Sequence, residues 1–447
     1  MTPPKPPVRA EKVSLWRYLR LFRRDILSAQ PARLYRAWMA EFRTPFFRSY
    51  LCNDPALVKR VLSERPEDFP KSDRIREGLS PLLGNSVFLT NGADWARQRR
   101  IIDPAFQGGR LRDTFPAILA AGQAAVARMP EGVVDVEPQM SHAAADVIFR
   151  ALFSIPIEDA VAAKVFDQFR QHQRSQPLLN MAAFLPLPAW VPRFHRRTAK
   201  ATARAIRQLI AGLTEARAKS IRAGTAPFDL ATKIMTTADP ETAACFDTAE
   251  MVDQVAIFFL AGHETSASAL AWALYLLASH PAAQNRVAHE AASLGDAPDF
   301  AMLAGLTFTR DVFREALRLY PPVPMMVREN RCPEVMRGRQ VAAGAQIVLS
   351  PWHVQRHERI WDRPDDFDPD RWQTDAGRAS AKDGFIAFSA GPRACPGAGF
   401  AMAEGVLLLA LLVARYQFLV VAGRVPVPVA HLTVRAKDGI WLRVERR

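Results

Sequence analysis

The sequence predicts a mainly α-helical fold with a small β region, in which one large domain follows a short proline-rich segment. Most long stretches between Gly and Pro breakers have the apolar spacing of helices, and residues 249–279 are apolar on nearly every side, as in a central buried helix. The 447 residues contain no Gly/Ser-rich linker and no internal repeat. We therefore expect a loose segment at residues 1–12 and a single domain at residues 13–447.

The composition indicates which kinds of binding partner and which cellular compartment to expect. A formal net charge of +14 suggests an acidic partner or an anionic surface, but no helix-turn-helix or zinc-finger pattern supports nucleic-acid binding. The four cysteines lie far apart without a C-x-x-C pair, which favours a reducing compartment. The sequence shows neither an apolar signal region nor a run of about 20 apolar residues. We expect a cytoplasmic monomer without a transmembrane anchor or a nucleic-acid partner.

The first half of the chain is predicted to be mainly helical. Residues 13–27 form a basic amphipathic pattern, whose apolar stripe we expect to pack on the domain rather than on a membrane surface. Residues 73–89 contain several helix breakers and are predicted to be irregular. The other elements expected here are a strand at 46–52 and helices at 55–65, 111–129, 141–153, 160–172 and 193–223.

The helix at residues 249–279 contains an unusual polar step, AGHETS. Glu264 and Thr265 lie in apolar surroundings, where unpaired polar groups are costly. Gly262 is a poor helix former, and Thr265 can bond back to a carbonyl of the preceding turn. Together they suggest a local opening with room for a small ligand, and a satisfied polar kink is the alternative.

The second half of the chain combines helices with short strands. Glu315 and Arg318 have i, i+3 spacing on one predicted helix, which is typical of a helix salt bridge. The C-terminal stretch 425–444 is predicted to be a β-hairpin that turns near Asp438 and Gly439. The remaining elements expected here are a helix at 309–320 and strands at 323–327 and 346–350.

The stretch FIAFSAGPRACPGAGFAMAE places one cysteine in a glycine-containing loop directly before a long apolar helix. Cys395 would lie at a helix N-terminus, which favours a thiolate and depresses the thiol pKa. Gly391 and Gly397 can take positive φ or let the backbone approach a flat cofactor closely. Phe388 can shield the sulfur, and Arg393 can pair with a cofactor carboxylate. An isolated cysteine would more often be structural, but the register F-x-x-G-x-R-x-C-x-G favours a cofactor loop.

This loop resembles the haem-binding loop of the cytochromes P450, in which a cysteine thiolate is the axial ligand of the haem iron. The sequence is identified as a member of this family, of the soluble bacterial type. Ser266 stands where many members have a second threonine, which is a small departure. The motifs that match the family, in its order, are Trp95 and Arg99 as W-x-x-x-R, Glu264 with Thr265, Glu315 and Arg318 as E-x-x-R, Arg371 in RPDDFDPDRW, and the Cys395 loop.

The resemblance implies a triangular helical prism around a buried haem b and a haem-thiolate monooxygenase activity. One oxygen atom of O2 enters a C–H or C=C bond of an apolar organic substrate, and the other leaves as water, with two electrons from NAD(P)H. Glu264 and Thr265 would deliver the protons that this reaction consumes. Residues that would hold the haem propionates are Trp95, Arg99, Arg328 and Arg393. Residues that would hold the cysteine loop are Glu315, Arg318 and Arg371.

The resemblance also implies redox partners and a substrate pocket for this protein. No reductase segment is visible, so we expect electrons from a ferredoxin and a ferredoxin reductase. An acidic ferredoxin would dock on basic residues near Trp95, namely Arg97, Arg100, Arg110 and Arg112.

The family places a mobile lid at residues 177–192, although an ordinary apolar loop explains that composition equally well. Pocket candidates are Leu79, Leu82, Phe88, Phe184, Phe258, Ala261, Val323, Met325 and Met326. Their apolar character allows a fatty acid, terpenoid, steroid or aromatic substrate.

Two alternatives remain at this stage. A haem-thiolate peroxygenase or isomerase needs no reductase, but such enzymes usually lack the acid–threonine pair. A non-catalytic haem-binding sensor would need neither a proton relay nor a lid. Turnover with NADH and redox partners, compared with turnover with peroxide alone, separates the three.

Overall fold

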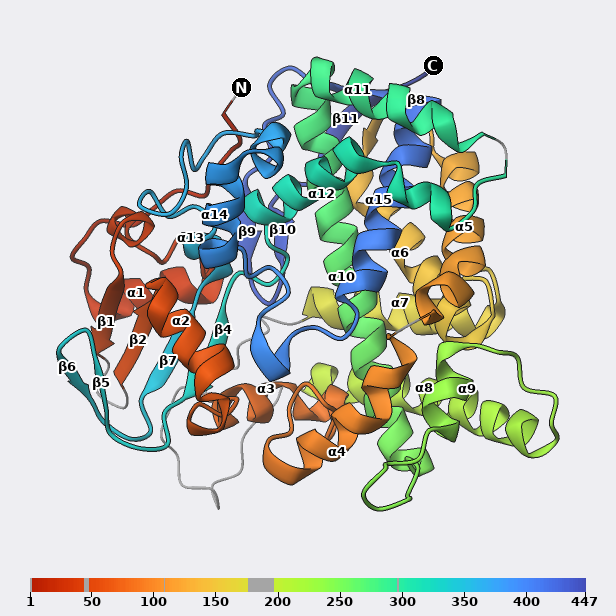
Figure 1. Ribbon diagram of the computed structural model, residues 1–447, viewed down its shortest axis with the longest axis horizontal. Coiled ribbons are helices and arrows are strands. Elements are labelled where there is room, and N and C mark those ends of the chain that lie inside the picture. The colour runs from red at the N-terminus through yellow and green to blue at the C-terminus, as the bar shows by residue number, and fades with distance from the viewer. Residues whose placement is uncertain (1, 44–47, 108, 176–196, 296) are drawn as a thin grey trace.

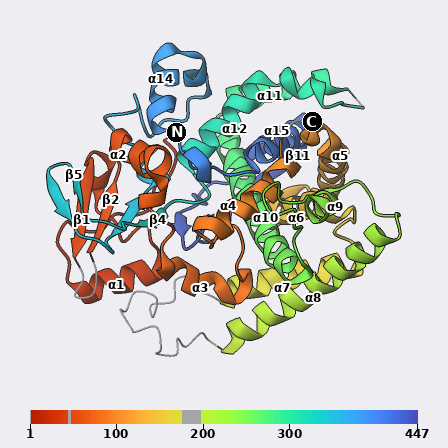
Figure 2. The same ribbon diagram turned by 60° about the horizontal axis from the view of Figure 1, so that its bottom comes forward.

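The computed structural model describes residues 2–43, 48–107, 109–175, 197–295 and 297–447. Helices make up the larger part of the molecule, and the sheet that contains β1, β2, β7 and β4 lies at one side with the β5–β6 pair (Figure 1). Helix α10 (Thr248–Ser279) runs through the helical part, and it stays central when the molecule is turned (Figure 2). The predicted fold class, mainly α with a small β region, is confirmed.

The helices around α10 agree with most of the predicted ranges to within a few residues. Helix α6 starts five residues earlier than expected. Helices of the N-terminal half are α1 (Leu15–Arg24), α2 (Pro55–Lys59), α3 (Asp73–Leu83), α4 (Gly92–Ile102), α5 (Arg110–Arg128), α6 (Val136–Phe153), α7 (Ala160–Ser175), α8 (Arg197–Arg222) and α9 (Leu230–Thr236). Those after α10 are α11 (Pro281–Ala291), α12 (Thr307–Leu319), α13 (Pro351–Val354), α14 (Asp375–Gly384) and α15 (Ala398–Arg415).

Helix α10 is buried almost throughout. Its N-terminus has a capping box, in which Asp247 and Glu250 exchange side-chain and backbone hydrogen bonds. The helix packs on α6, α8, α12 and α15. No break interrupts the helix, and the predicted local opening with room for a small ligand stays a prediction. Gly262 serves packing, because a Cβ there would lie 3.0 Å from Ile148 Cδ1 on α6.

The four-stranded sheet has the order β1-β2-β7-β4. Strands β1 (Met39–Arg43) and β2 (Arg48–Cys52) are antiparallel, β2 pairs in parallel with β7 (Gln346–Leu349), and β7 is antiparallel to β4 (Met326–Glu329). The strand predicted at 323–327 therefore begins three residues late. Pro322 and Pro324 lack the N–H groups that a ladder needs, which moves the start of pairing downstream.

The C-terminal segment does not form the single hairpin that was predicted. Strands β9 (Pro428–Ala430) and β10 (Val434–Ala436) form a short hairpin of their own. Strand β11 (Trp441–Arg446) instead lies between β3 (Gly132–Asp135) and β8 (Tyr416–Val420). Strands β5 (Glu334–Met336) and β6 (Arg339–Val341) make one further pair. Gly439 has φ +81° as expected for a turn, but the turn leads β11 to a distant partner.

Two N-terminal predictions are also corrected. Residues 73–89 are not irregular, because α3 forms there despite Pro81 and buries Leu79, Leu82 and Leu83. The segment 2–12 is attached rather than loose: Tyr320 donates a hydrogen bond to Pro4 O over 2.9 Å.

Helix α1 packs with Tyr18 and Phe22 partly buried, while Trp16 is 84% exposed. Among the described residues, only Ala398–Arg415 is long and apolar enough to be a candidate membrane span, and 56% of it is buried as in a core helix.

Candidate functional site

Cys395 faces accessible space inside the protein. Its side chain is exposed, yet burial by the surrounding protein raises the pKa of its thiol, and the Gly397 N–H and Arg99 lower it only in part. The predicted depression of this pKa is therefore wrong for the free thiol, because desolvation outweighs the helix N-terminus. The backbone holds the residue in place, since Cys395 N donates to Phe388 O over 2.9 Å. A cation that binds the sulfur would displace its proton.

The two glycines of the loop have different roles. Gly391 has φ +65°, and a Cβ there would lie 2.1 Å from Leu62 O, so this position requires glycine for both conformation and packing. Gly397 has φ −86°, which is ordinary, and a Cβ would meet nothing closer than Phe106 at 3.9 Å. Gly391 thus approaches the neighbouring helical turn rather than a cofactor.

Three cations surround the indole of Trp95. The charged groups of Lys71, Arg99 and Arg393 lie 5.7, 6.0 and 5.3 Å from the centre of the Trp95 ring. Lys71 Nζ donates to two backbone carbonyls, Val87 O at 2.6 Å and Thr90 O at 3.1 Å. The predicted propionate residues Trp95, Arg99 and Arg393 are thus brought together, and Lys71 joins them.

Arg328 adds a fourth positive charge to this cluster. Burial and the charge of Arg393 lower the pKa of Arg328 to about 10. Burial, followed by the charges of Arg328, Arg393 and Arg99, lowers the pKa of Lys71 well below its ordinary value. The four side chains repel one another in a poorly solvated place, which we call the cation cluster (Lys71, Arg99, Arg328 and Arg393).

The cation cluster is short of anions in the described part of the chain. Arg99 pairs with Asp103 at 2.7 Å, and Arg393 reaches only the exposed Glu67 at 3.8 Å. Buried nitrogens without a hydrogen-bond partner include Arg328 Nε, Arg393 Nε and Arg393 Nη2. Such orphaned donors cost stability unless an acceptor binds them. The cluster therefore fits an anionic ligand with carboxylate groups, such as the two propionates of haem.

The face of α10 near this space is its least buried part. Between Met251 and Ala278, only Ala261, Gly262 and Thr265 are not buried. Thr265 Oγ1 donates to Ala261 O over 2.5 Å, as the sequence suggested. Phe106 links α10 to the cysteine loop, because its ring lies 5.9 Å from that of Phe258 and next to Gly397. We use the name internal space for the accessible surroundings of Cys395, Ala261 and Thr265.

Glu264 does not share the surroundings of Thr265. Its side chain is buried and meets the β9–β10 hairpin, where Thr433 donates a hydrogen bond to Glu264 Oε1 and Arg435 forms an ion pair with the same oxygen. The acid and the hydroxyl are consecutive in sequence, but a helix turns about 100° per residue. Thr265 thus lies on the accessible face of α10, whereas the carboxylate of Glu264 is turned toward the β9–β10 hairpin, and their joint catalytic role stays a prediction.

Glu315, Arg318 and Arg371 form a buried network. Arg318 binds the Glu315 carboxylate at 2.9 and 2.8 Å, and Arg371 Nε binds it at 2.9 Å. Burial opposes ionisation of Glu315, but the charges and hydrogen bonds of Arg318 and Arg371 outweigh it and lower the pKa of this carboxyl. Trp372 and the Asp368 backbone add further hydrogen bonds to the carboxylate.

This network is connected to the cysteine loop. Arg318 Nη1 donates to Gln355 O over 2.8 Å, and Gln355 Oε1 accepts from Ile386 N over 2.9 Å. Ile386 lies at the start of the stretch that leads to Cys395. The predicted structural role of the three residues is supported by this path of hydrogen bonds.

The pocket candidates are dispersed around α10. Leu79, Leu82 and Phe258 are buried in one apolar cluster, and Phe88 and Ala261 are exposed. The candidates that are partly buried are Val323, Met325 and Met326. Phe184 and the predicted lid at 177–192 lie outside the described residues.

Most of the arginines that were predicted to bind a ferredoxin already have partners within the protein. Arg97 pairs with Glu250, and Arg100 pairs with Asp239 at 2.6 Å and Glu241 at 2.9 Å. Arg110 lies 4.6 Å from the ring centre of Phe228 and 3.4 Å from Asp113. The expected patch of free positive charge near α4 is therefore largely compensated, and Arg112 remains exposed.

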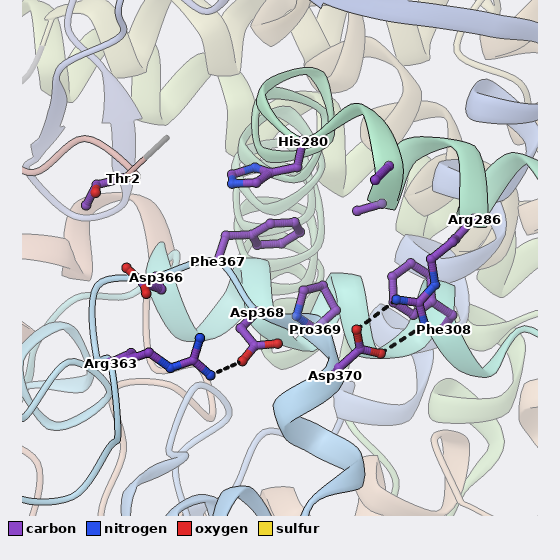
Figure 3. A pocket seen from close by; sticks show the side chains of 12 residues that line it. Thr2, His280, Arg286, Phe308, Arg363, Asp366, Phe367, Asp368, Pro369 and Asp370 are labelled. Carbon is purple, nitrogen blue, oxygen red and sulfur yellow. Dashed lines mark hydrogen bonds and ion pairs between the residues drawn. The ribbon is translucent and has the colours of Figure 1, made fainter.

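A second, open pocket lies beside the Glu315 network (Figure 3). Its ionic groups are mostly paired: Arg286 binds Asp370 at 2.8 and 2.9 Å, and Arg363 binds Asp368 at 2.6 Å. It lies among α11, α12 and the segment before Arg371.

Sequence reasoning missed four residues near the site. Glu404, which accepts a hydrogen bond from Ser266 of α10, could have been found because it is an acid in the apolar helix α15. Nothing local marks Lys71, Thr433 or Arg435. These three reach the site only through long-range packing.

The fold, the cation cluster and the lone cysteine at the internal space define a class of proteins that bind haem through a thiolate. Residues 42–442 match the cytochrome P450 family. Cyclooctat-9-en-7-ol 5-monooxygenase of Streptomyces melanosporofaciens is 32% identical over 428 residues, which cover 93% of this chain and 89% of that protein. Pentalenene oxygenase of Streptomyces avermitilis is 31% identical over 406 residues, 89% of this chain and 88% of that protein. Human cytochrome P450 4A11 is 28% identical over 422 residues, 88% and 79% of the two chains.

The chain belongs to the cytochrome P450 family and is a haem-dependent monooxygenase, an oxidoreductase.

Proposed function

We propose that this P450 binds haem b through Cys395 and oxidises a C–H or C=C bond of a cyclic, terpenoid-like substrate in the cytoplasm. The observation that carries the proposal is the convergence of the cation cluster around Trp95, next to a lone cysteine at the internal space. Haem bound to a thiolate supplies the oxygen chemistry, and the protein supplies binding, orientation and protons.

Each part of the site has a task in this proposal. Cys395 would be the residue that holds the haem iron, as a thiolate, and Phe388 would cover the loop. The cation cluster would hold the two propionates by charge-assisted hydrogen bonds, and Trp95 packs among the cations. Thr265 holds a proton donor at the internal space, and Glu264 resupplies it. The Glu315 network keeps the cysteine loop in one conformation.

The substrate class is inferred from the relatives and the apolar lining together. Two of the similar Streptomyces proteins are named for cyclic, largely hydrocarbon compounds, cyclooctat-9-en-7-ol and pentalenene. The described pocket candidates near α10 are apolar, and an apolar pocket selects apolar ligands. Met325 and Met326 provide an adaptable wall.

Electrons must reach the haem from other proteins in this proposal. A ferredoxin and its reductase are the partners we propose, and the net charge of +14 favours an acidic electron donor. We propose that the protein acts as a monomer.

Spectroscopy tests the ligand and the substrate class. The dithionite-reduced protein with carbon monoxide should show the strongly red-shifted Soret band of a thiolate-bound haem, and Cys395→Ala should abolish it while Cys245→Ala leaves it intact. A spectrum typical of histidine-bound haem would overturn the proposal. Cyclic terpenoids should shift the ferric spin state more than fatty acids do.

Turnover then separates the remaining activities. Product should form with NAD(P)H, ferredoxin and reductase. Product formation with peroxide alone would indicate a peroxygenase.

A further inference from the structure

The carboxylate of Glu264 is held from the side of the C-terminal hairpin. Thr433 and Arg435 both contact its Oε1 oxygen, one through a hydroxyl and the other through a guanidinium. Two donors on one oxygen fix both the place and the orientation of a carboxylate. Since Glu264 is buried on α10, this arrangement decides where a proton can enter and leave it.

The two side chains come from one short stretch of backbone. Thr433 directly precedes β10 and Arg435 lies within it, and both contact Glu264 while Val434 between them is fully buried. One short stretch of backbone therefore positions both donors.

The hairpin backbone is anchored without the help of these side chains. Val434 N donates to Pro322 O over 2.9 Å, and Val434 O accepts from Ser268 Oγ over 2.5 Å. Ala430 N donates to Asp25 Oδ1 over 2.8 Å. Removing the guanidinium should therefore leave the hairpin in place, and an effect on catalysis can be told from an effect on folding.

Arg435 also connects the buried acid to the surface. Its side chain is 38% exposed, whereas that of Glu264 is 5% exposed. Glu137 of α6 lies beside the hairpin, because its carboxylate accepts from Ala436 N over 2.8 Å. Burial raises the pKa of Glu137 to about 7, and the charge of Arg435 opposes this shift. A carboxyl whose pKa lies near neutrality thus binds the backbone next to Arg435 and feels the charge of its guanidinium.

We infer that Arg435 and Thr433 are positioning residues, which hold Glu264 at the inner end of a proton route that begins at the surface beside Glu137. The guanidinium keeps its own proton throughout, because arginine stays charged in proteins. Glu264 gives a proton toward Thr265 and takes one back from the outer side. Each productive turnover consumes two electrons and two protons and releases one water, so a slow resupply limits product formation. The inference rests on the proposed roles of Glu264 and Thr265.

Arg435→Met removes the charge and keeps most of the length of the side chain. We expect unchanged haem content and substrate-induced spin shift. We expect product formation to fall at least about fivefold, a fraction of the roughly 100-fold that a positioned proton donor contributes. The solvent isotope effect on turnover in D2O should rise, because proton transfer becomes rate-limiting. Arg435→Lys should restore part of the rate, and Arg443→Met, which removes an exposed charge from β11, should leave it unchanged.

A double-mutant cycle tells positioning from a merely structural role. If Arg435 acts through Glu264, Arg435→Met should have little further effect on turnover in the Glu264→Gln background, since the group it positions is already lost. The melting temperatures of the same four haem-loaded proteins should also be non-additive, which reports the ion pair independently of activity. Equal effects of Arg435→Met on turnover in both backgrounds, or an unchanged isotope effect, would overturn the inference.

The same experiments separate this inference from the proposed function. If wild-type protein forms no product with its redox partners, or lacks the thiolate spectrum, the proposed function itself fails. If the wild type turns over and Arg435→Met does so equally well, only the proton route is wrong. Thr433→Val should reproduce the isotope effect of Arg435→Met to a smaller extent.

Discussion

Ser266 Oγ on α10 donates a hydrogen bond to Glu404 Oε2 on α15 over 2.7 Å. This contact joins the helix that carries the Glu264–Thr265 pair to the helix that follows Cys395. Both residues are buried, and Glu404 Oε1 has no hydrogen-bond partner. This polar contact in an apolar region thereby holds α10 and α15 together. It is made by Ser266, the residue that stands where many members of the family have a second threonine.

Glu404 gives the protein a pH-dependent stability. Burial raises its pKa to about 8, and the Ser266 hydrogen bond opposes the shift only in part. In the unfolded chain a glutamate titrates at about 4.3, so between these values the folded state holds a proton that the unfolded state has lost. Stability should therefore be greatest below the unfolded value and fall as pH rises toward about 8, with a slope of up to about 1.4 kcal/mol per pH unit.

Glu404→Gln should remove this part of the slope. Thermal unfolding of the haem-loaded protein at several pH values between about 5 and 9 measures it. Glu137, whose pKa is raised to about 7, should leave a residual slope that ends near pH 7, so the loss in Glu404→Gln should be clearest between about pH 7 and 8. Identical slopes in wild type and Glu404→Gln would show that Glu404 is not protonated in the folded state.

Removing Glu315 should destabilise the cysteine loop. Two buried guanidinium groups would lose their carboxylate, and breaking a buried pair in this way costs roughly 3–5 kcal/mol. We expect Glu315→Ala to yield little haem-loaded protein, measured as the ratio of Soret to protein absorbance. Asp370→Ala is the matched control, because its ion pair with Arg286 is exposed on both sides and should contribute less than about 1 kcal/mol. Normal haem loading of Glu315→Ala would mean that the network does not hold the loop.

The cation cluster should set the affinity for haem. Lys71→Met removes one charge from the cluster, and a hydrogen bond to a charged group contributes about 1.5 kcal/mol or more, so haem should dissociate about tenfold faster. Transfer of haem to apomyoglobin measures this rate without any need for turnover. Arg331→Met, which removes an exposed charge nearby, serves as the control. A dissociation rate equal to wild type in Lys71→Met would exclude Lys71 from propionate binding.

Thr265→Ala should uncouple electron transfer from product formation. Its hydroxyl is the polar group of α10 at the internal space, and without it the two electrons leave with two protons and O2 as hydrogen peroxide. NAD(P)H consumption should stay at a comparable rate, while product per NAD(P)H falls several-fold. Thr265→Ser should retain coupling, and Glu264→Gln should slow turnover instead. If Thr265→Ala remains fully coupled, its hydroxyl only satisfies the Ala261 carbonyl.

Electron transfer from an acidic ferredoxin should weaken with salt, because exposed charges are screened beyond about 8 Å at physiological ionic strength. Arg112→Ala should slow reduction at low salt. Arg100→Ala should do so less, since Arg100 already pairs with Asp239 and Glu241. A reduction rate that is independent of salt in wild type would exclude docking of the ferredoxin on the basic residues near Trp95.

Much of the fold and of the site could be predicted from local sequence. The cysteine loop, the E-x-x-R pair and the polar step of α10 are short patterns, in which neighbouring residues share one helix or one turn. The apolar composition of residues 249–279 placed this helix at the centre of the fold, and α10 is buried there. Errors arose where tertiary packing overrides local propensity, as in α3, whose buried leucines outweigh Pro81.

Only the tertiary structure decided which distant groups meet. The sequence alone determined the family, the axial cysteine candidate and the class of reaction, because these depend on residue type and spacing. It did not show that Lys71 joins Trp95, that Arg97 and Arg100 are neutralised, or that Arg435 reaches Glu264. Each of these contacts joins segments that are separated by 20 or more residues. Their free energies depend on desolvation, and the extent of desolvation is set by tertiary burial, which a local sequence pattern does not specify. The thiol of Cys395 illustrates the difference: its position at a helix N-terminus suggested a lowered pKa, and the surrounding protein raises it.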